Sequence, residues 1–141
     1  MARDATIQDI QELAEEFRSG IHDQLGVDLG YDAASVEWTD GYINRIRERL
    51  PDEGKNGLAN VIGCFVGQCM VEAYGYEWAY HPDQGWGVRA DDNNWAFPVA
   101  KSRKHLHDGP EDSVASMFRV FPALIAHSKE EREKRSSPDA S

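Results

Sequence analysis

The segment of residues 57–74, followed by Gly75, restricts the possible folds more than any other part of the chain. At 100° per residue, apolar side chains surround nearly the whole helix. Only three polar side chains interrupt them: Asn60, Gln68 and Glu72. Because such a helix must be covered on most sides, we predict that it is the central helix of the fold, capped by Asn56. Gly75 supplies the left-handed conformation that commonly ends a helix.

Three small residues, Ala59, Gly63 and Gly67, recur every four positions in this segment and form a ridge almost free of side chains. A bare ridge lets another backbone approach closely, although each helical glycine costs about 1 kcal/mol relative to alanine. We therefore predict that the ridge is a packing surface, and that Gly67→Val destabilises the protein by about 1–3 kcal/mol.

Apolar periodicity predicts two helices before the central one. The first covers residues 7–24 and begins after Thr6. The second begins after a cap at Asp32 or Ser35 and ends before Pro51. On the second helix, two aromatic residues four positions apart, Trp38 and Tyr42, should pack side by side.

The sequence becomes strand-like after the central helix. Residues 76–80, 86–89 and 95–97 are short, rich in aromatic side chains and separated by turn-forming residues. This pattern predicts a three-stranded antiparallel meander.

Two further helices are predicted after the meander. Pro98 fits the first turn of a short basic helix over residues 99–108. Residues 110–112 should open a last helix, which Pro122 should bend. The segment 129–141 is a charged tail that we predict to be flexible, either as a frayed helix or as a disordered chain.

The order of three helices, three strands and two helices predicts an α+β fold, with the helices segregated to one face of a small sheet. A chain of 141 residues suits one domain, which we assign to residues 1–128. The sequence does not define an oligomeric state.

The chain is acidic, with a net charge of −10 and with 13 acids against 5 bases in residues 1–53. An acidic surface repels phosphate backbones, so we predict no direct nucleic-acid binding and favour a basic protein partner. We assign the partner-facing acidic surface to Glu12, Glu15 and Glu16. The alternative is that these charges only keep the protein soluble.

No apolar run approaches the roughly 20 residues that span a bilayer, and the N-terminus lacks the apolar core of a signal peptide. We therefore predict a cytoplasmic protein without membrane contact. The two cysteines, Cys64 and Cys69, point about 140° apart on the central helix, so we expect free, buried thiols.

Five short motifs occur between residues 36 and 125: Gly63-x-x-x-Gly67-Gln68, Gly75-x-x-Trp78, Gly85-Trp86-Gly-Val88, Phe97-Pro98 and His107-Asp-Gly109-x-Glu-Asp-Ser113. Together they resemble a class of small bacterial domains without an assigned function, in which Glu is more frequent at the position of Gln68. The resemblance implies a bacterial, cytoplasmic origin. It implies no activity, cofactor or site residue.

Catalytic and metal sites are disfavoured by the spacing of the reactive side chains. Cys64, Cys69, His105 and His107 are the candidate zinc ligands, but structural zinc needs four convergent ligands, whereas the two cysteines point to different sides of one helix and no Cys-x-x-Cys pair exists. A buried helical thiol also lacks the positive surroundings that lower its pKa, which disfavours a nucleophile with a histidine base. Nothing in the spacing of four carboxylates forces an acid–base pair: Glu72, Glu77, Asp91 and Asp92. We therefore predict no catalytic residue, no metal and no cofactor.

Two features are better candidates for binding. Gln68 and Glu72 share one side of the central helix, where they either line a cleft or bond to other elements. The meander combines Trp86 and Trp95 with Arg89, a composition typical of recognition surfaces, although packing in the core is an alternative for its rings. We predict a noncatalytic protein-binding or immunity-type interaction domain. The alternative is a small enzyme or ligand-binding domain with a pocket near Gln68, Glu72 and the meander tryptophans.

Overall fold

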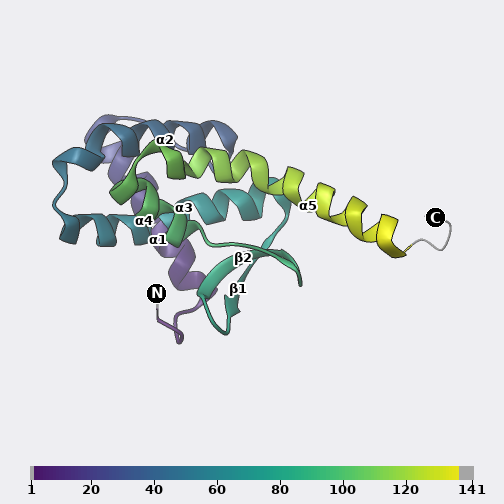
Figure 1. The fold of residues 1–141 in the computed structure, drawn as a ribbon. Coiled ribbons are helices and arrows are strands. Elements are labelled where there is room, and N and C mark those ends of the chain that lie inside the picture. The colour runs from purple at the N-terminus through teal and green to yellow at the C-terminus, as the bar shows by residue number, and fades with distance from the viewer. Residues whose placement is uncertain (1, 137–141) are drawn as a thin grey trace.

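The computed structural model describes residues 2–136 and has the predicted α+β architecture (Figure 1). Its main elements, in chain order, are α1 (Ile7–Leu25), α2 (Ala33–Ile46), α3 (Asp52–Tyr74), β1 (Glu77–His81), β2 (Gly85–Asp91), β3 (Asn94–Ala96), α4 (Pro98–Asp108) and α5 (Val114–Ser136). Short 3-10 helices, η1 (Arg47–Arg49) and η2 (Pro110–Asp112), follow α2 and α4. Within residues 2–136, no helix combines the length and the apolar character needed to cross a bilayer.

Helix α1 begins and ends close to the predicted positions. The Thr6 hydroxyl accepts the Asp9 N–H at 3.2 Å, and the Asp9 carboxylate accepts the Thr6 N–H at 2.8 Å. This reciprocal cap satisfies two backbone donors that the first turn would leave unpaired. Gly26 then ends the helix with φ 68°. The prediction for residues 7–24 is confirmed.

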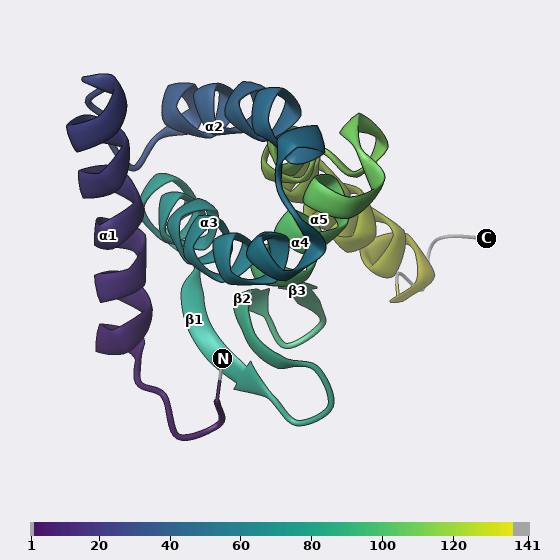
Figure 2. The same cartoon turned by 90° about the vertical axis from the view of Figure 1, so that its left-hand side faces the viewer.

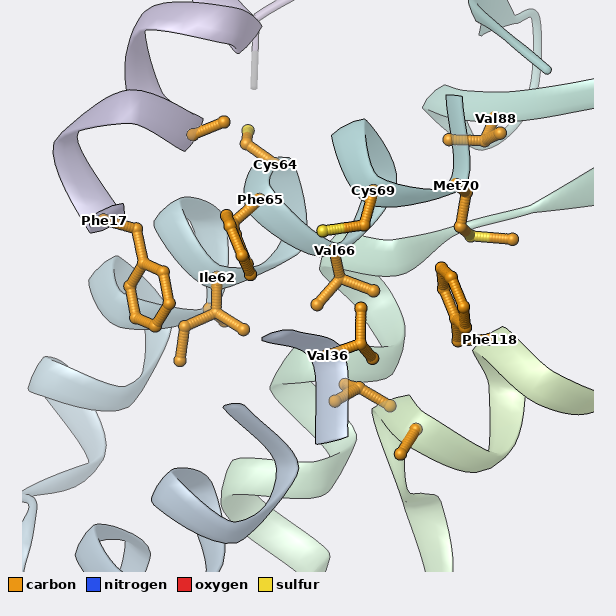
Figure 3. Close-up of a cluster of buried hydrophobic side chains, with 14 of the residues drawn as sticks. Phe17, Val36, Ile62, Cys64, Phe65, Val66, Cys69, Met70, Val88 and Phe118 are labelled. Carbon is orange, nitrogen blue, oxygen red and sulfur yellow. The ribbon is translucent and has the colours of Figure 1, made fainter. Parts of the chain in front are cut away.

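Helix α3 is the central helix, as predicted. Every residue from Ile62 to Met70 is buried, and its side chains pack between Phe17 of α1 and Phe118 of α5 (Figure 3). Gly75 ends the helix with φ 73°, also as predicted. The predicted start is wrong, because α3 begins at Asp52 rather than Gly57, and Asn56 lies inside the helix instead of capping it.

The bare ridge of α3 is a packing surface, which confirms that prediction. A Cβ placed on Gly63 would lie 2.4 Å from the Cα of Val99, at the start of α4. A Cβ on Gly67 would lie 2.2 Å from Cη2 of Trp78 in β1. Carbon atoms in contact are normally about 3.5–4.0 Å apart, so neither position has room for a side chain. The two glycines therefore seat α4 and the sheet directly on α3.

The three strands form the predicted antiparallel meander in the order β1-β2-β3. Trp78, Val88 and Ala96 are cross-strand neighbours and are all buried on the face that packs on α3 and α4. The helices gather on this one side of the sheet (Figures 1 and 2). Since side chains alternate between faces, the residues next to these three belong to the opposite, outer face.

The C-terminal helices differ from the prediction at one junction. Pro98 occupies the first turn of α4 and Gly109 follows its last residue, both as predicted. Residues 110–112 do not open the last helix, because they form η2 and α5 begins at Val114. The Ser113 hydroxyl accepts the Ser116 N–H at 3.1 Å and caps α5.

Helix α5 continues through Pro122 to Ser136. Proline has no N–H, so the Phe118 carbonyl four residues earlier loses its helical donor. The Tyr74 hydroxyl donates to this carbonyl at 2.9 Å instead. Of the predicted tail, residues 129–136 are helical, and residues 137–141 lie outside the part that the structure describes.

Candidate functional site

The outer face of the meander carries a compact group of rings that we call the outer-face cluster: His81, Trp95 and Phe97. The rings of Trp95 and Phe97 stack with centroids 6.0 Å apart and an interplanar angle of 7°. The His81 ring meets them edge-on, at 5.0 Å from Trp95 and 5.8 Å from Phe97. All three side chains are half-buried, so the cluster is both ordered and accessible.

Small residues beneath the cluster let the rings lie close to the sheet. Ala79 and Gly87 are cross-strand partners, and Gly85 is the partner of His81. A Cβ on Gly87 would lie 2.8 Å from Cε1 of Phe97, which shows that this ring occupies the space above Gly87. Because these positions carry little or no side chain, the rings approach one another across β2.

Arg89 lies beside the cluster and is held by two carboxylates. Its Nε donates to Glu77 Oε1 at 2.9 Å, a second guanidinium nitrogen binds the same oxygen, and Nη1 lies 3.5 Å from Asp92 Oδ1. The hydrogen bond to Glu77 raises the pKa of Arg89. The guanidinium carbon lies 5.9 Å from the centroid of the Trp95 ring. Arg89 therefore orders the Trp95 ring, and its charge is already compensated.

The orientation of His81 follows from the turn between β1 and β2. Its Nδ1 accepts the backbone N–H groups of Asp83 and Gln84, at 3.1 and 3.2 Å. A nitrogen that accepts two N–H groups carries no proton, so the proton of the neutral ring lies on Nε2. This leaves one N–H donor at the edge of the cluster.

The rim of the cluster is acidic. Glu77, Asp83 and Asp92 are exposed around it; Glu77 and Asp92 pair with Arg89, and the Asp83 carboxylate has no ion pair within residues 2–136. The Trp95 ring is stacked on Phe97 and already has Arg89 over it, so the exposed parts of the rings offer apolar contacts, and the carboxylates at the edge attract cationic side chains. The chemistry that this arrangement supports is recognition.

Two of the predicted binding residues, Gln68 and Glu72, lie away from the outer-face cluster and do not form a common site. Gln68 is buried, with 6% of its surface exposed, and its Oε1 accepts the indole N–H of Trp78 at 3.0 Å. This bond satisfies two polar groups inside the core, so Gln68 holds the sheet on α3. Glu72, one turn later, is exposed to solvent.

Trp86 lies on the inner face of the sheet, opposite to Arg89 and Trp95. Its ring meets Tyr80 edge-on at 5.7 Å. Its indole Nε1 is buried and has no hydrogen-bond partner among residues 2–136. Beside the ring is a hollow of about 130 Å³, also lined by Val99 and Arg103 but not by Gln68 or Glu72. Ligand pockets are typically about 300–1,000 Å³, so the hollow suits only a very small molecule.

The three predicted acids of α1 are all exposed, but they differ in their bonding. Glu15 accepts the Tyr31 hydroxyl at 2.8 Å and Arg18 Nη1 at 2.7 Å. These hydrogen bonds lower the pKa of Glu15, and they mean that its carboxylate is already paired within the chain. Glu12 and Glu16 have no ion pair within the described chain, so they carry the charge that a partner would meet.

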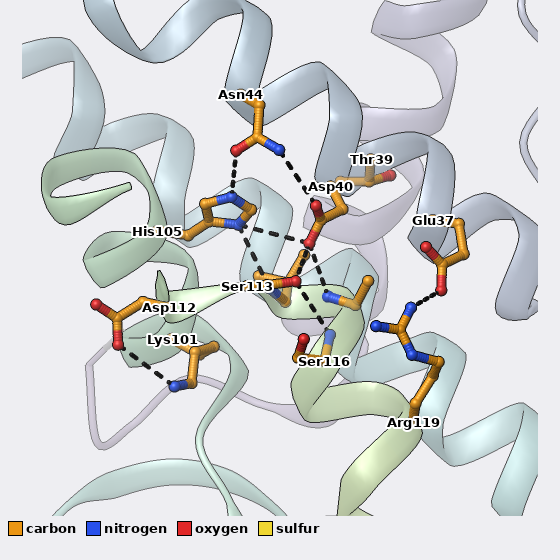
Figure 4. Close-up of polar contacts among 12 residues, drawn as sticks. Glu37, Thr39, Asp40, Asn44, Lys101, His105, Asp112, Ser113, Ser116 and Arg119 are labelled. Carbon is orange, nitrogen blue, oxygen red and sulfur yellow. Dashed lines mark hydrogen bonds and ion pairs between the residues drawn. The ribbon is translucent and has the colours of Figure 1, made fainter. Parts of the chain in front are cut away.

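A polar network at the junction of α2, α4 and α5 was not predicted (Figure 4). His105 is fully buried, and burial lowers its pKa. Its Nε2 bonds to Asn44 Oδ1 at 2.7 Å, and its Nδ1 accepts the Val114 N–H at 3.3 Å. Asp40 accepts the Ala115 N–H at 3.0 Å and the hydroxyl proton of Ser113.

Although this network contains Ser113, His105 and Asp40, its hydrogen bonds do not suit nucleophilic catalysis. A catalytic serine gives its proton to histidine, whereas Ser113 donates to Asp40. The Nδ1 of His105 is occupied by a backbone N–H of α5. The network satisfies the N-terminus of α5; Ser113 just before α5 was a potential cap in the sequence, whereas Asp40 lies inside α2 and gave no such signal.

Both cysteines are buried, as predicted, and neither takes part in a disulfide within residues 2–136. Burial raises the pKa of the Cys64 thiol to about 12 and raises that of Cys69 as well. Among residues 2–136, no three His, Cys, Asp or Glu side chains gather in a way that could hold a metal ion.

Comparisons with family models, with curated proteins and with solved structures found no match for this chain. The resemblance to a class of small bacterial domains therefore stays a prediction.

Proposed function

We propose that this protein is a noncatalytic, cytoplasmic interaction domain of bacteria, of the immunity type, that binds a basic protein. The observation that carries the proposal is the outer-face cluster, in which the stacked Trp95 and Phe97 rings are accessible and have an acidic rim. Tryptophan is enriched among the residues that dominate protein interfaces, because it contributes a large, rigid contact area. Glu77 and Asp92 share the single cation Arg89, so together with Asp83 the rim is net negative and complements a basic partner.

The acidic side of α1 supports the same partner chemistry. Glu12 and Glu16 are exposed and free of ion pairs within the described chain, and the whole chain carries a net charge of −10. Long-range attraction of this kind accelerates encounter with a basic protein and is screened by salt. In the proposal, α1 attracts the partner and the outer-face cluster holds it.

Parallel capture with matched baits tests the proposal. The wild-type protein, Trp95→Ala and Tyr80→Ala are immobilised and exposed to the same bacterial lysate. Tyr80 is the control because it is an exposed aromatic residue of the same meander, oriented toward the opposite face. A protein retained by wild type and Tyr80→Ala, but lost from Trp95→Ala, is then purified for binding kinetics.

We expect the purified partner to be basic and to bind Trp95→Ala at least about tenfold more weakly, as is typical of a tryptophan at the centre of an interface. Thermal unfolding of each bait controls for folding. A partner that binds Trp95→Ala and wild type equally would refute the assignment of the site.

Charge reversal tests the role of α1. Glu12→Lys with Glu16→Lys should slow association with the same partner and flatten its dependence on salt, because peripheral charges act mainly on the association rate. The melting temperature should stay nearly unchanged. Equal association rates for both proteins would mean that these acids serve solubility alone.

The alternative function, binding of a very small ligand, is supported by one observation. The buried indole N–H of Trp86 lacks a partner, and buried polar groups normally have one. A thermal-shift screen with small carboxylates tests it, with Trp86→Phe as the comparison. A shift that is present in wild type and absent in Trp86→Phe would favour the alternative.

A further inference from the structure

A second recognition surface lies on α2, away from the meander. It is a groove of about 550 Å³, which we call the α2 groove. Leu25 and Val27, at the end of α1 and just after it, form one wall. The other wall is one face of α2 and η1, with four large side chains: Trp38, Tyr42, Arg45 and Arg49.

The aromatic wall of the α2 groove is rigid. Trp38 and Tyr42 stack with centroids 5.2 Å apart and an interplanar angle of 14°, which confirms that they pack side by side. Tyr42 is fixed from behind by Phe17 of the core, whose ring meets it edge-on at 6.2 Å. Opposite these rings, 51% of the surface of Leu25 is exposed. The groove therefore presents an ordered apolar surface without rearrangement.

The two arginines of the groove have no carboxylate partner within residues 2–136. Arg18, Arg89 and Arg119 each pair with a carboxylate. Arg45 lies over the face of Trp38, with its guanidinium carbon 5.6 Å from the ring centroid, and neither Arg45 nor Arg49 has a hydrogen bond or ion pair within residues 2–136. Although the chain has 25 acidic residues against 15 basic ones, these two neighbouring arginines give the groove a local positive charge that no carboxylate of the described chain compensates.

We propose that the α2 groove binds an acidic segment of a partner protein, which places an apolar or aromatic side chain against Trp38 and Leu25 and carboxylates on Arg45 and Arg49. The argument for this occupant is charge complementarity, since arginine pairs with carboxylates in a planar, two-point geometry. The combination of Trp, Tyr and Arg is also the one that dominates binding energy in interfaces. The expected charge is opposite to that of the partner of the outer-face cluster, so this inference does not depend on the proposed function.

Selection from random peptides displayed on phage tests the inference without knowledge of the natural partner. The full-length wild-type chain is the target, and enriched peptides are synthesised and titrated by fluorescence anisotropy. Two variants are compared, Arg45→Glu with Arg49→Glu, and Arg3→Glu with Lys104→Glu. The second pair is the matched control, because it makes the same change in net charge at exposed bases outside the groove.

We expect enriched peptides to combine aspartate or glutamate with an aromatic or aliphatic residue. Their affinity should fall at least about tenfold for the groove variant and much less for the control. Trp38→Phe should weaken binding as well, and Trp95→Ala should not, which separates this surface from the outer-face cluster.

Three results would overturn the inference. The first is selection of basic peptides or of none, and the second is equal loss of affinity in both double variants. The third is concentration-dependent dimerisation of the wild-type chain, measured by analytical ultracentrifugation, that Arg45→Glu with Arg49→Glu abolishes. In that case the occupant of the groove is a second copy of this chain.

Discussion

Adding one methyl group at Gly67 should destabilise the protein although it improves helix propensity. The new Cβ would lie 2.2 Å from Cη2 and 2.4 Å from Cζ2 of Trp78, and 3.2 Å from Cγ of Pro98. The Trp78 ring would have to move by more than about 1 Å to restore a normal carbon contact. It is restrained by its hydrogen bond to Gln68 and by the sheet.

The two opposing contributions determine the expected magnitude. Replacing glycine by alanine in a helix interior gains about 1 kcal/mol, whereas overpacking a core typically costs about 1–3 kcal/mol and sometimes more. For a contact this short against a restrained ring, we expect the upper part of that range, and hence a net loss of about 1–2 kcal/mol for Gly67→Ala. Gly67→Val should lose more.

Urea unfolding, followed by circular dichroism and tryptophan fluorescence, measures the effect. Gly20 of α1 is the matched control, because no atom outside its chain neighbours and the backbone of its own helix lies within 4 Å of the position of its Cβ. Gly20→Ala should therefore stabilise by up to about 1 kcal/mol. Trp78→Phe removes the two clashing ring atoms, so combining it with Gly67→Ala should recover part of the loss. If Gly67→Ala were as stable as wild type, the close seating of Trp78 on α3 would be wrong.

Three further predictions concern buried groups. Burial lowers the pKa of His105, so its contribution to stability should be complete above the unfolded value of about 6.5 and decline as the pH falls below it. The urea midpoint should therefore fall less between pH 8 and pH 5 for His105→Gln than for wild type. The raised pKa values of Cys64 and Cys69 should protect both thiols from Ellman's reagent at pH 8 until urea is added. Gln68→Leu leaves the Trp78 indole N–H unpaired and should lower the free energy of unfolding by about 1–3 kcal/mol.

The sequence predicted the elements of the fold well because their burial patterns are strong. The nearly continuous apolar surface of α3 predicts a buried helix, and the alternation of residues 76–97 predicts an antiparallel meander. The errors occur where solvated residues determine a boundary. Residues 52–56 carry no apolar period, yet they form the start of α3, where the acids Asp52 and Glu53 suit a helix N-terminus.

The candidate sites were predictable to different degrees. Arg89 and Trp95 lie together because both belong to the outer face of adjacent strands, and the odd spacing between Trp86 and Arg89 already implies opposite faces. The partner of Gln68 was not predictable, because its bond to Trp78 depends on how the sheet docks on α3.

One wall of the α2 groove could be predicted from the spacing of its residues. Trp38, Tyr42, Arg45 and Arg49 follow one another at intervals of four, three and four, which places them on one helical face. The sequence could not show that Leu25 from the end of α1 would lie opposite them. That arrangement depends on the path of the loop between the two helices.

Pro122 has a consequence for the way in which α5 opens. The side chain of Tyr74 replaces the missing backbone bond at Phe118, and Ile125 is the last buried residue of the described helix. Amide hydrogens before Pro122 should therefore exchange with solvent only when the whole domain unfolds, whereas those of residues 126–136 should exchange through local fraying. Helix α5 thus leaves the cooperative folding unit after Ile125, beyond the turn that the bond from Tyr74 supports.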